Sequence, residues 1–128
     1  MPRLAIHSES APKAIGPYSQ AVRAGNTLYL SGQTPLDPET GEMVAGDVSA
    51  QAERVFKNLE AVLAAGGASF DDVVRVAIYM TDLGNFGAVN AVMQRHFSEP
   101  YPARSTIGVA ALPRGAGVEI DVIAVVSG

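Results

Sequence analysis

A β-strand with a rigid start is predicted by the stretch Tyr101-Pro102-Ala103-Arg104-Ser105-Thr106-Ile107-Gly108-Val109. Pro100 and Pro102 cannot donate backbone hydrogen bonds, and each holds the residue before it extended. Because side chains alternate along a strand, Arg104 and Thr106 share one face, and the other face carries Ala103, Ser105, Ile107 and Val109. The stretch therefore sets the direction of an arginine near the beginning of a strand.

Arg104 has two interpretations at this point. Its planar guanidinium suits a carboxylate or a phosphate that accepts two hydrogen bonds at once. Alternatively, it is an edge-strand arginine that discourages aggregation or pairs with a surface acid. The rest of the chain has to distinguish these two.

A second strand, expected at residues 118–126, begins with two acids on one of its faces. Its apolar face would cover the helices, whereas the other face starts with Glu119 and Asp121 and becomes apolar towards its end. Acids in such a place need a partner, a wet cavity or exposure to water. If this strand pairs with 103–110 as a hairpin, one of the two acids lies near Arg104 and Thr106 on the same face.

The remaining periodic segments complete an α+β pattern. Strands are expected at 3–7, 21–24, 27–31 and 73–80, with Gly25-Asn26 as a hairpin turn. One helix should begin after the N-cap Asp47 and end at Gly66-Gly67. A second helix should span 85–97, capped by Asn85 or Asp82.

The order β-β-β-α-β-α-β-β implies an α+β sandwich, in which two helices pack on one face of a six-stranded mixed sheet. The second face of this sheet would carry Arg104, Thr106, Glu119, Ile123 and Val125. That set is too mixed for a core and too apolar for free water. Contact with another subunit would resolve the conflict.

Asn90 is the one polar member of the expected inward stripe of the second helix, which otherwise consists of Phe86, Val89, Met93 and Phe97. Such an amide either satisfies a neighbouring backbone group or borders a polar cavity. Both possibilities remain open from the sequence.

Composition narrows the class of protein. The 128 residues suffice for one domain, 1–128, with a real core. A net charge of −4 argues against nucleic acid as the main partner. Cysteine is absent, which excludes disulfides, thiolate metal sites and cysteine nucleophiles. Neither a secretion signal nor a segment of membrane-spanning length is apparent, so we expect a cytoplasmic protein without a membrane partner.

Several motifs together resemble the RidA (YjgF) family of reactive-intermediate deaminases. They occur in family order along nearly the whole chain: residues 14–21 (AIGPYSQA), 30–35 (LSGQTP), Asn58-Leu59, residues 88–90 (AVN), 101–105 (YPARS) and 118–124 (VEIDVIA). Each is weak alone, but the set is specific. The resemblance implies a chorismate-mutase-like fold, a homotrimer with a cleft at each subunit boundary, and no metal or organic cofactor.

The family hydrolyses short 2-imino acids and their enamine tautomers to 2-keto acids and ammonia. By position, the resemblance implies that Arg104 binds the substrate carboxylate, Glu119 polarises the attacking water, and Tyr18 lies near the reacting nitrogen. Ser31, Gly32 and Asn90 would line the pocket. Thr106 stands where the family often has cysteine. The resemblance implies that this position acts largely through its backbone, so threonine should be tolerated, although its β-branched, hydroxyl-bearing side chain would alter pocket size and substrate preference.

This chemistry needs no nucleophile–base pair, because an imine carbon is already electrophilic and a positioned water can attack it. Two other functions stay open. One is a non-catalytic trimer that binds 2-keto acids, and the other is an RNA-cleaving or translation-inhibiting protein. The acidic composition and the presence of only two histidines count against the second.

Overall fold

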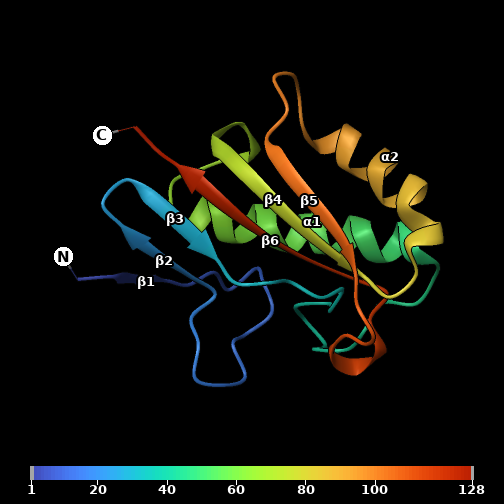
Figure 1. The fold of residues 1–128 in the computed structure, drawn as a ribbon. Helices are drawn as coiled ribbons and strands as arrows, with labels where there is room; N and C mark the ends of the chain where they lie inside the picture. The colour runs from blue at the N-terminus through green and yellow to red at the C-terminus, as the bar shows by residue number, and fades with distance from the viewer. Residues whose placement is uncertain (1, 128) are drawn as a thin grey trace.

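The computed structural model describes residues 2–127. Its main elements confirm the expected order: β1 (Leu4–Ile6), β2 (Ala21–Ala24), β3 (Thr27–Leu30), α1 (Val48–Ala65), β4 (Val73–Met80), α2 (Phe86–His96), β5 (Ala103–Gly108) and β6 (Val118–Val125). In Figure 1, α1 runs behind the sheet and α2 lies beside its β5 edge. The fold is an α+β arrangement of one six-stranded mixed sheet and two helices.

The strand order is β1-β2-β3-β6-β4-β5, so the conditional hairpin between 103–110 and 118–126 is wrong. β5 pairs in parallel with β4, whereas β6 lies antiparallel between β3 and β4. The reason is the β4–α2–β5 unit, because a helical crossover delivers the second strand parallel to the first. The connection at 109–117 then lets the chain cross to the other side of β4.

Caps predicted from the sequence define α1. The Asp47 carboxylate accepts a hydrogen bond from Ala50 N at 3.0 Å, and Gly66 ends the helix. For α2, the cap belongs to the short 3₁₀ turn before it: Asp82 Oδ1 accepts from Gly84 N at 2.8 Å, and the Asn85 side chain makes no capping bond. No helix within 2–127 is long and apolar enough to cross a bilayer.

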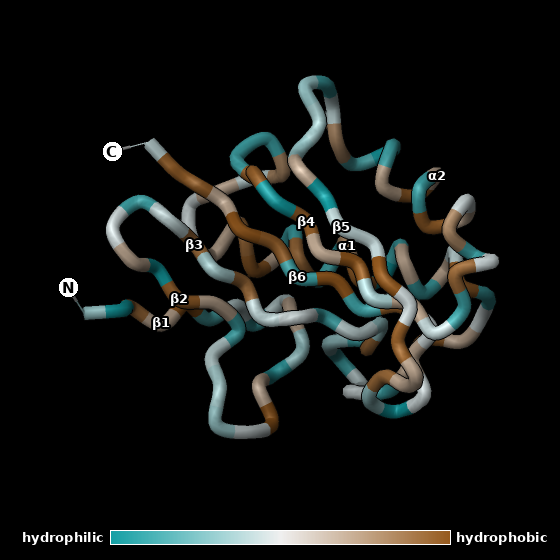
Figure 2. Tube along the Cα trace, viewed as in Figure 1, coloured by the Kyte–Doolittle hydropathy of each residue, from teal (hydrophilic) through white to brown (hydrophobic). Residues whose placement is uncertain are grey.

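The core lies between the sheet and the helices. α1 contributes side chains that are fully buried, among them Val55, Phe56, Leu59 and Leu63. They meet the alternating apolar residues of the two central strands, which include Val76, Ile78, Met80, Val118, Ile120 and Val122. Figure 2 shows hydrophobic colour along β4 and β6 in the middle of the sheet. Period-2 alternation therefore directs one face of each central strand to the helices.

The opposite face of the sheet keeps large apolar side chains exposed. Tyr29, Ile107 and Val125 are 48%, 48% and 44% exposed. Arg104 and Thr106, which we expected on this face, are not there. Arg104 is in register with Val76 and Thr106 with Ile78, and both of those β4 residues are buried against the helices.

Replacing Leu59 with alanine removes a fully buried side chain of α1. We expect the free energy of unfolding to fall by about 2–5 kcal/mol, because the change loses transfer free energy and leaves a cavity. Urea denaturation followed by circular dichroism measures the difference. Lys57→Ala, at an exposed position of the same helix, is the matched control and should change stability by less than about 0.5 kcal/mol. Equal losses in both variants would contradict the assigned core.

Candidate active site

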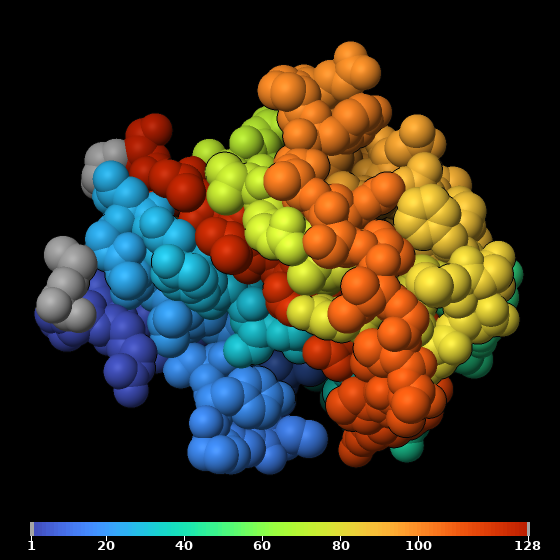
Figure 3. All heavy atoms as spheres, in the orientation of Figure 1, coloured from blue at the N-terminus to red at the C-terminus, as the bar shows by residue number. Residues whose placement is uncertain are grey.

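Glu119, near the beginning of β6, lies in a hollow of about 400 Å³, which we call the Glu119 hollow. Three other predicted site residues, Tyr18, Ser31 and Gly32, line it as well. In Figure 3 the loop that carries Tyr18 forms a blue lobe, separated by a notch from the orange-red turn near residue 114. The structure thus brings together residues that are about a hundred positions apart in the sequence.

The end of β3 fixes one wall of this hollow. Ser31 N donates to Gln20 O at 2.9 Å, and Ser31 Oγ donates to Ser19 O at 2.6 Å. Gly32 follows directly, and a Cβ added there would lie 2.9 Å from Glu119 Cδ. A side chain at position 32 would therefore displace the Glu119 carboxylate from its present place.

The surroundings of Glu119 favour its neutral form. Burial raises the pKa of this carboxyl above its ordinary value, and the negative charge of Asp121 raises it further. Asp121 in turn accepts a hydrogen bond from the Tyr79 hydroxyl and thereby raises the pKa of Tyr79. A carboxyl with an elevated pKa suits proton transfer near neutral pH.

Arg104 lies in a second hollow, of about 410 Å³, between β5 and α2, which we call the Arg104 hollow. Its Nη1 donates to Asn90 Oδ1 at 2.6 Å, and the guanidinium carbon lies 5.1 Å from the centre of the Phe86 ring. Both partners are uncharged, so they orient the cation without neutralising it. Asn90 therefore borders a hollow of mixed character, lined by the polar Gln94 and Arg104 and by the apolar Met93 and Pro102.

Thr106 lies two residues further along β5, at a shallow surface hollow that it shares with Arg104, Phe86 and Leu83. Its Oγ1 is buried and has no hydrogen-bond partner among the residues that the structure describes. A buried hydroxyl without a hydrogen-bond partner destabilises the folded state, and such groups are therefore unusual in folded chains.

The predicted site residues thus form two groups on opposite faces of the sheet. Tyr18, Ser31 and Gly32 accompany Glu119, whereas Asn90 and Thr106 accompany Arg104. None of the ion pairs within 2–127 involves either Arg104 or Glu119, so both side chains remain available to a ligand. No group of three or more His, Asp or Glu in that range could hold a metal ion.

Sequence reasoning missed three residues of these hollows. Phe86 was assigned to the core, although its helical spacing of four from Asn90 placed both on one side of α2. Lys13 and Arg114 bring positive charge to the Glu119 hollow. Arg114 Nη1 donates to Gly41 O at 2.6 Å, which joins two loops that no periodic pattern connects.

Comparison with known proteins assigns the family. A family model described as endoribonuclease L-PSP matches residues 8–126. The chain belongs to the endoribonuclease L-PSP (RidA) family. Within this family, it is 64% identical over 127 residues to Protein DfrA of Myxococcus xanthus, across 98% of this chain and 97% of that protein. That name states no activity.

Two other members of the RidA family carry more informative names. The 2-iminobutanoate/2-iminopropanoate deaminase of Dermatophagoides farinae is 49% identical over 125 residues, which is 98% of each chain. The crystal structure of RidA from the Antarctic bacterium Psychrobacter sp. PAMC 21119 is also 49% identical. It superposes with a TM-score of 0.92 over 95% of this chain and 98% of that chain.

The titration of Glu119 tests the electrostatics of its hollow. We expect the Glu119 carboxyl to titrate above the ordinary value of 4.5, because burial disfavours its charged form. Asp121→Asn should lower the pKa of Glu119 towards 4.5 but leave it above that value, since burial is the larger cause of the upward shift. Carboxyl ¹³C chemical shifts across pH 3–9 measure both. A wild-type Glu119 that titrates at or below 4.5 would contradict the assigned environment.

Proposed function

We propose that this protein hydrolyses short 2-imino acids and their enamine tautomers, such as 2-iminobutanoate and 2-iminopropanoate, to 2-keto acids and ammonia. The observation that carries the proposal is a pair of ionisable groups without an ion-pair partner in the described range: an arginine oriented by Asn90 and Phe86, and the half-buried Glu119 carboxyl beside Tyr18. The 49% identity to a named deaminase supports the same reaction. The substrate and product are small molecules, and the reaction requires no cofactor.

Arg104 binds the substrate carboxylate through two parallel hydrogen bonds in this proposal. Glu119 accepts a proton from a water molecule, whose oxygen adds to the electrophilic C2 atom of the imine. That proton passes to the imine nitrogen, which gives a carbinolamine. Glu119 then takes the proton of the new hydroxyl group and delivers it to the amine nitrogen, so that the C=O bond forms as the C–N bond breaks and ammonia leaves. Tyr18 donates a hydrogen bond near the reacting nitrogen. Ser31, Gly32, Asn90 and Thr106 shape the pocket.

A site that uses both Arg104 and Glu119 has to form between copies of the chain, because the two side chains occupy separate hollows on opposite faces of the sheet. The proposal therefore includes a homotrimer in which each copy lends Arg104 to one neighbour and Glu119 to the other. The exposed Tyr29, Ile107 and Val125 supply apolar surface for such contacts. Residues 1–128 act as one domain in this assembly, and we place it in the cytoplasm.

Two alternatives are outcomes of the same experiments. A non-catalytic 2-keto-acid-binding trimer would use Arg104 alone and leave Glu119 without a role. An RNA-cleaving or translation-inhibiting protein is suggested by the description of the family model, but the net charge of −4 disfavours an RNA backbone as ligand. RNA binding with a steep salt dependence would support it.

Arg104→Ala should lower kcat/KM for freshly generated 2-iminobutanoate by about 10- to 100-fold, because hydrogen bonds to a charged partner are lost. The kcat/KM of Arg104→Lys should lie between those of wild type and Arg104→Ala, since lysine keeps the charge but not the paired donors. Ammonia release in a coupled assay measures both variants. Arg23→Ala is the matched control and should retain activity, because Arg23 lies on β2 and its Nε donates to Gly25 O in the following turn. If wild type binds 2-ketobutyrate but never accelerates ammonia release, the binding-module alternative is correct.

Mixing two inactive variants tests whether the site is shared. Glu119→Gln should slow turnover by about 100-fold, as expected when an acid–base group is lost. When Glu119→Gln and Arg104→Ala chains are unfolded together in equal amounts and refolded, about a quarter of the sites should combine an intact Arg104 with an intact Glu119. Activity should recover in proportion. No recovery, with trimers of normal mass, would show that both groups act within one chain.

A further inference from the structure

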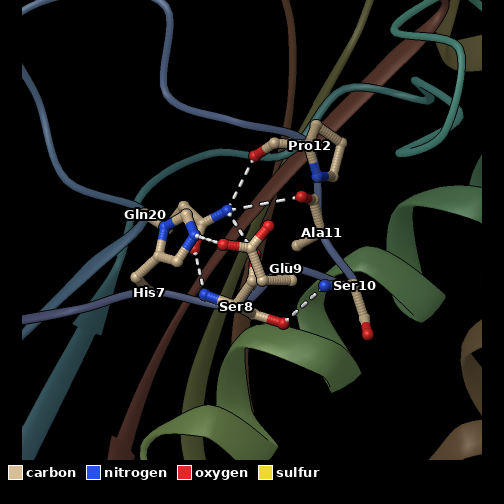
Figure 4. Close-up of polar contacts among 7 residues, drawn as sticks. All are labelled: His7, Ser8, Glu9, Ser10, Ala11, Pro12 and Gln20. Carbon is tan, nitrogen blue, oxygen red and sulfur yellow. Dashed lines mark hydrogen bonds and ion pairs between the residues drawn. The ribbon is translucent and has the colours of Figure 1, made fainter.

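A single buried amide closes the base of the loop that carries Tyr18. Gln20 is 3% exposed, and its Nε2 donates to the backbone oxygens of Pro12 at 2.8 Å, Ser8 at 3.1 Å and Ala11 at 3.4 Å. Its Oε1 accepts from Ser8 N at 2.6 Å. Figure 4 shows these bonds converging on the amide from the 8–12 segment. Gln20 thus holds the beginning of the loop.

The same residue also holds the end of the loop through its backbone. Gln20 O accepts from Ser31 N, and the adjacent Ser19 O accepts from Ser31 Oγ. Both ends of the loop at residues 13–19 are therefore bonded to Gln20, as in a compact surface loop whose ends are close together. Within it, Tyr18 N donates to Gly16 O at 2.8 Å.

The loop itself has little apolar burial to hold it in place. Ile15 is 76% exposed and Tyr18 is 51% exposed. Loops of this kind open locally unless their bases are tied to the folded body. A buried amide is an effective tie, because each polar atom that loses its partner would remain desolvated. The loop contributes Lys13, Ile15 and Tyr18 to the Glu119 hollow.

We infer that Gln20 is a positioning residue for the proposed deamination: its side-chain amide fixes the 13–19 loop so that Tyr18 is held beside Glu119. This inference rests on the proposed function. Gln20 also lines the Glu119 hollow, but both polar atoms of its amide are bonded to the 8–12 segment, so in this role it acts through Tyr18 and not by binding substrate.

Hydrogen exchange tests the anchoring without any enzyme assay. Gln20→Met has a similar length but no donor, and Gln20→Glu has the same shape but cannot donate when ionised. In either variant that folds, we expect faster exchange, by about tenfold or more, for the Tyr18 amide, which bonds Gly16 O within the loop, and for the Ser31 amide, which bonds Gln20 O at its base, with α1 unchanged. Ser8→Ala removes only the hydrogen bond that Ser10 N donates to Ser8 Oγ in the same segment, and it should leave the Tyr18 and Ser31 amides protected. Unchanged exchange in both Gln20 variants would overturn the inference.

A double-mutant cycle tests whether Gln20 acts through Tyr18. Gln20→Met should lower kcat/KM about tenfold in the wild-type background but less than about twofold in a Tyr18→Phe background, because the positioned hydroxyl is already gone. A purely structural role would cost the same in both backgrounds, and that result would overturn the inference. A wild-type protein without deaminase activity would refute the proposed function itself. The exchange experiment would then still show whether Gln20 anchors the loop.

Discussion

The pairing of β4 with β5 on one side and with β6 on the other determines on which faces of the sheet the Arg104 hollow and the Glu119 hollow lie. Val76 is in register with Arg104 and with Val122, so Arg104 shares the helix-facing side of the sheet. Tyr79 is in register with Ile107 and with Glu119, so the carboxylate shares the other side. Because side chains alternate with a period of two, a slip of one residue in either pairing would exchange these faces.

The two hollows are chemically complementary although each is incomplete. In the Arg104 hollow, the guanidinium is oriented by the neutral amide of Asn90 and by the Phe86 ring. In the Glu119 hollow, burial and Asp121 raise the pKa of the Glu119 carboxyl. An anionic substrate with an electrophilic carbon needs one group of each kind. The separation of the two groups in one chain is the reason that the proposed site is shared between copies.

Two buried amides hold the loops that surround the Glu119 hollow. Gln20 ties the 8–12 segment, and Asn58 Nδ2 donates to Thr34 O at 3.3 Å and to Leu36 O at 3.0 Å. Both side chains are almost fully buried, so they act as fixed points between loops and core. Irregular segments can therefore carry functional groups with the precision that regular elements normally provide.

The sequence by itself determined the elements, because caps such as Asp47, turns such as Gly25-Asn26 and the alternation along 118–126 act within a few residues. It also identified the residues that the family motifs single out. Only the tertiary structure decided the strand order, and with it the separation of Arg104 from Glu119 and the contact of Arg104 with Phe86. Local patterns could not supply these facts, since the partner of a strand depends on the crossover through α2 and on core packing between residues distant in the chain.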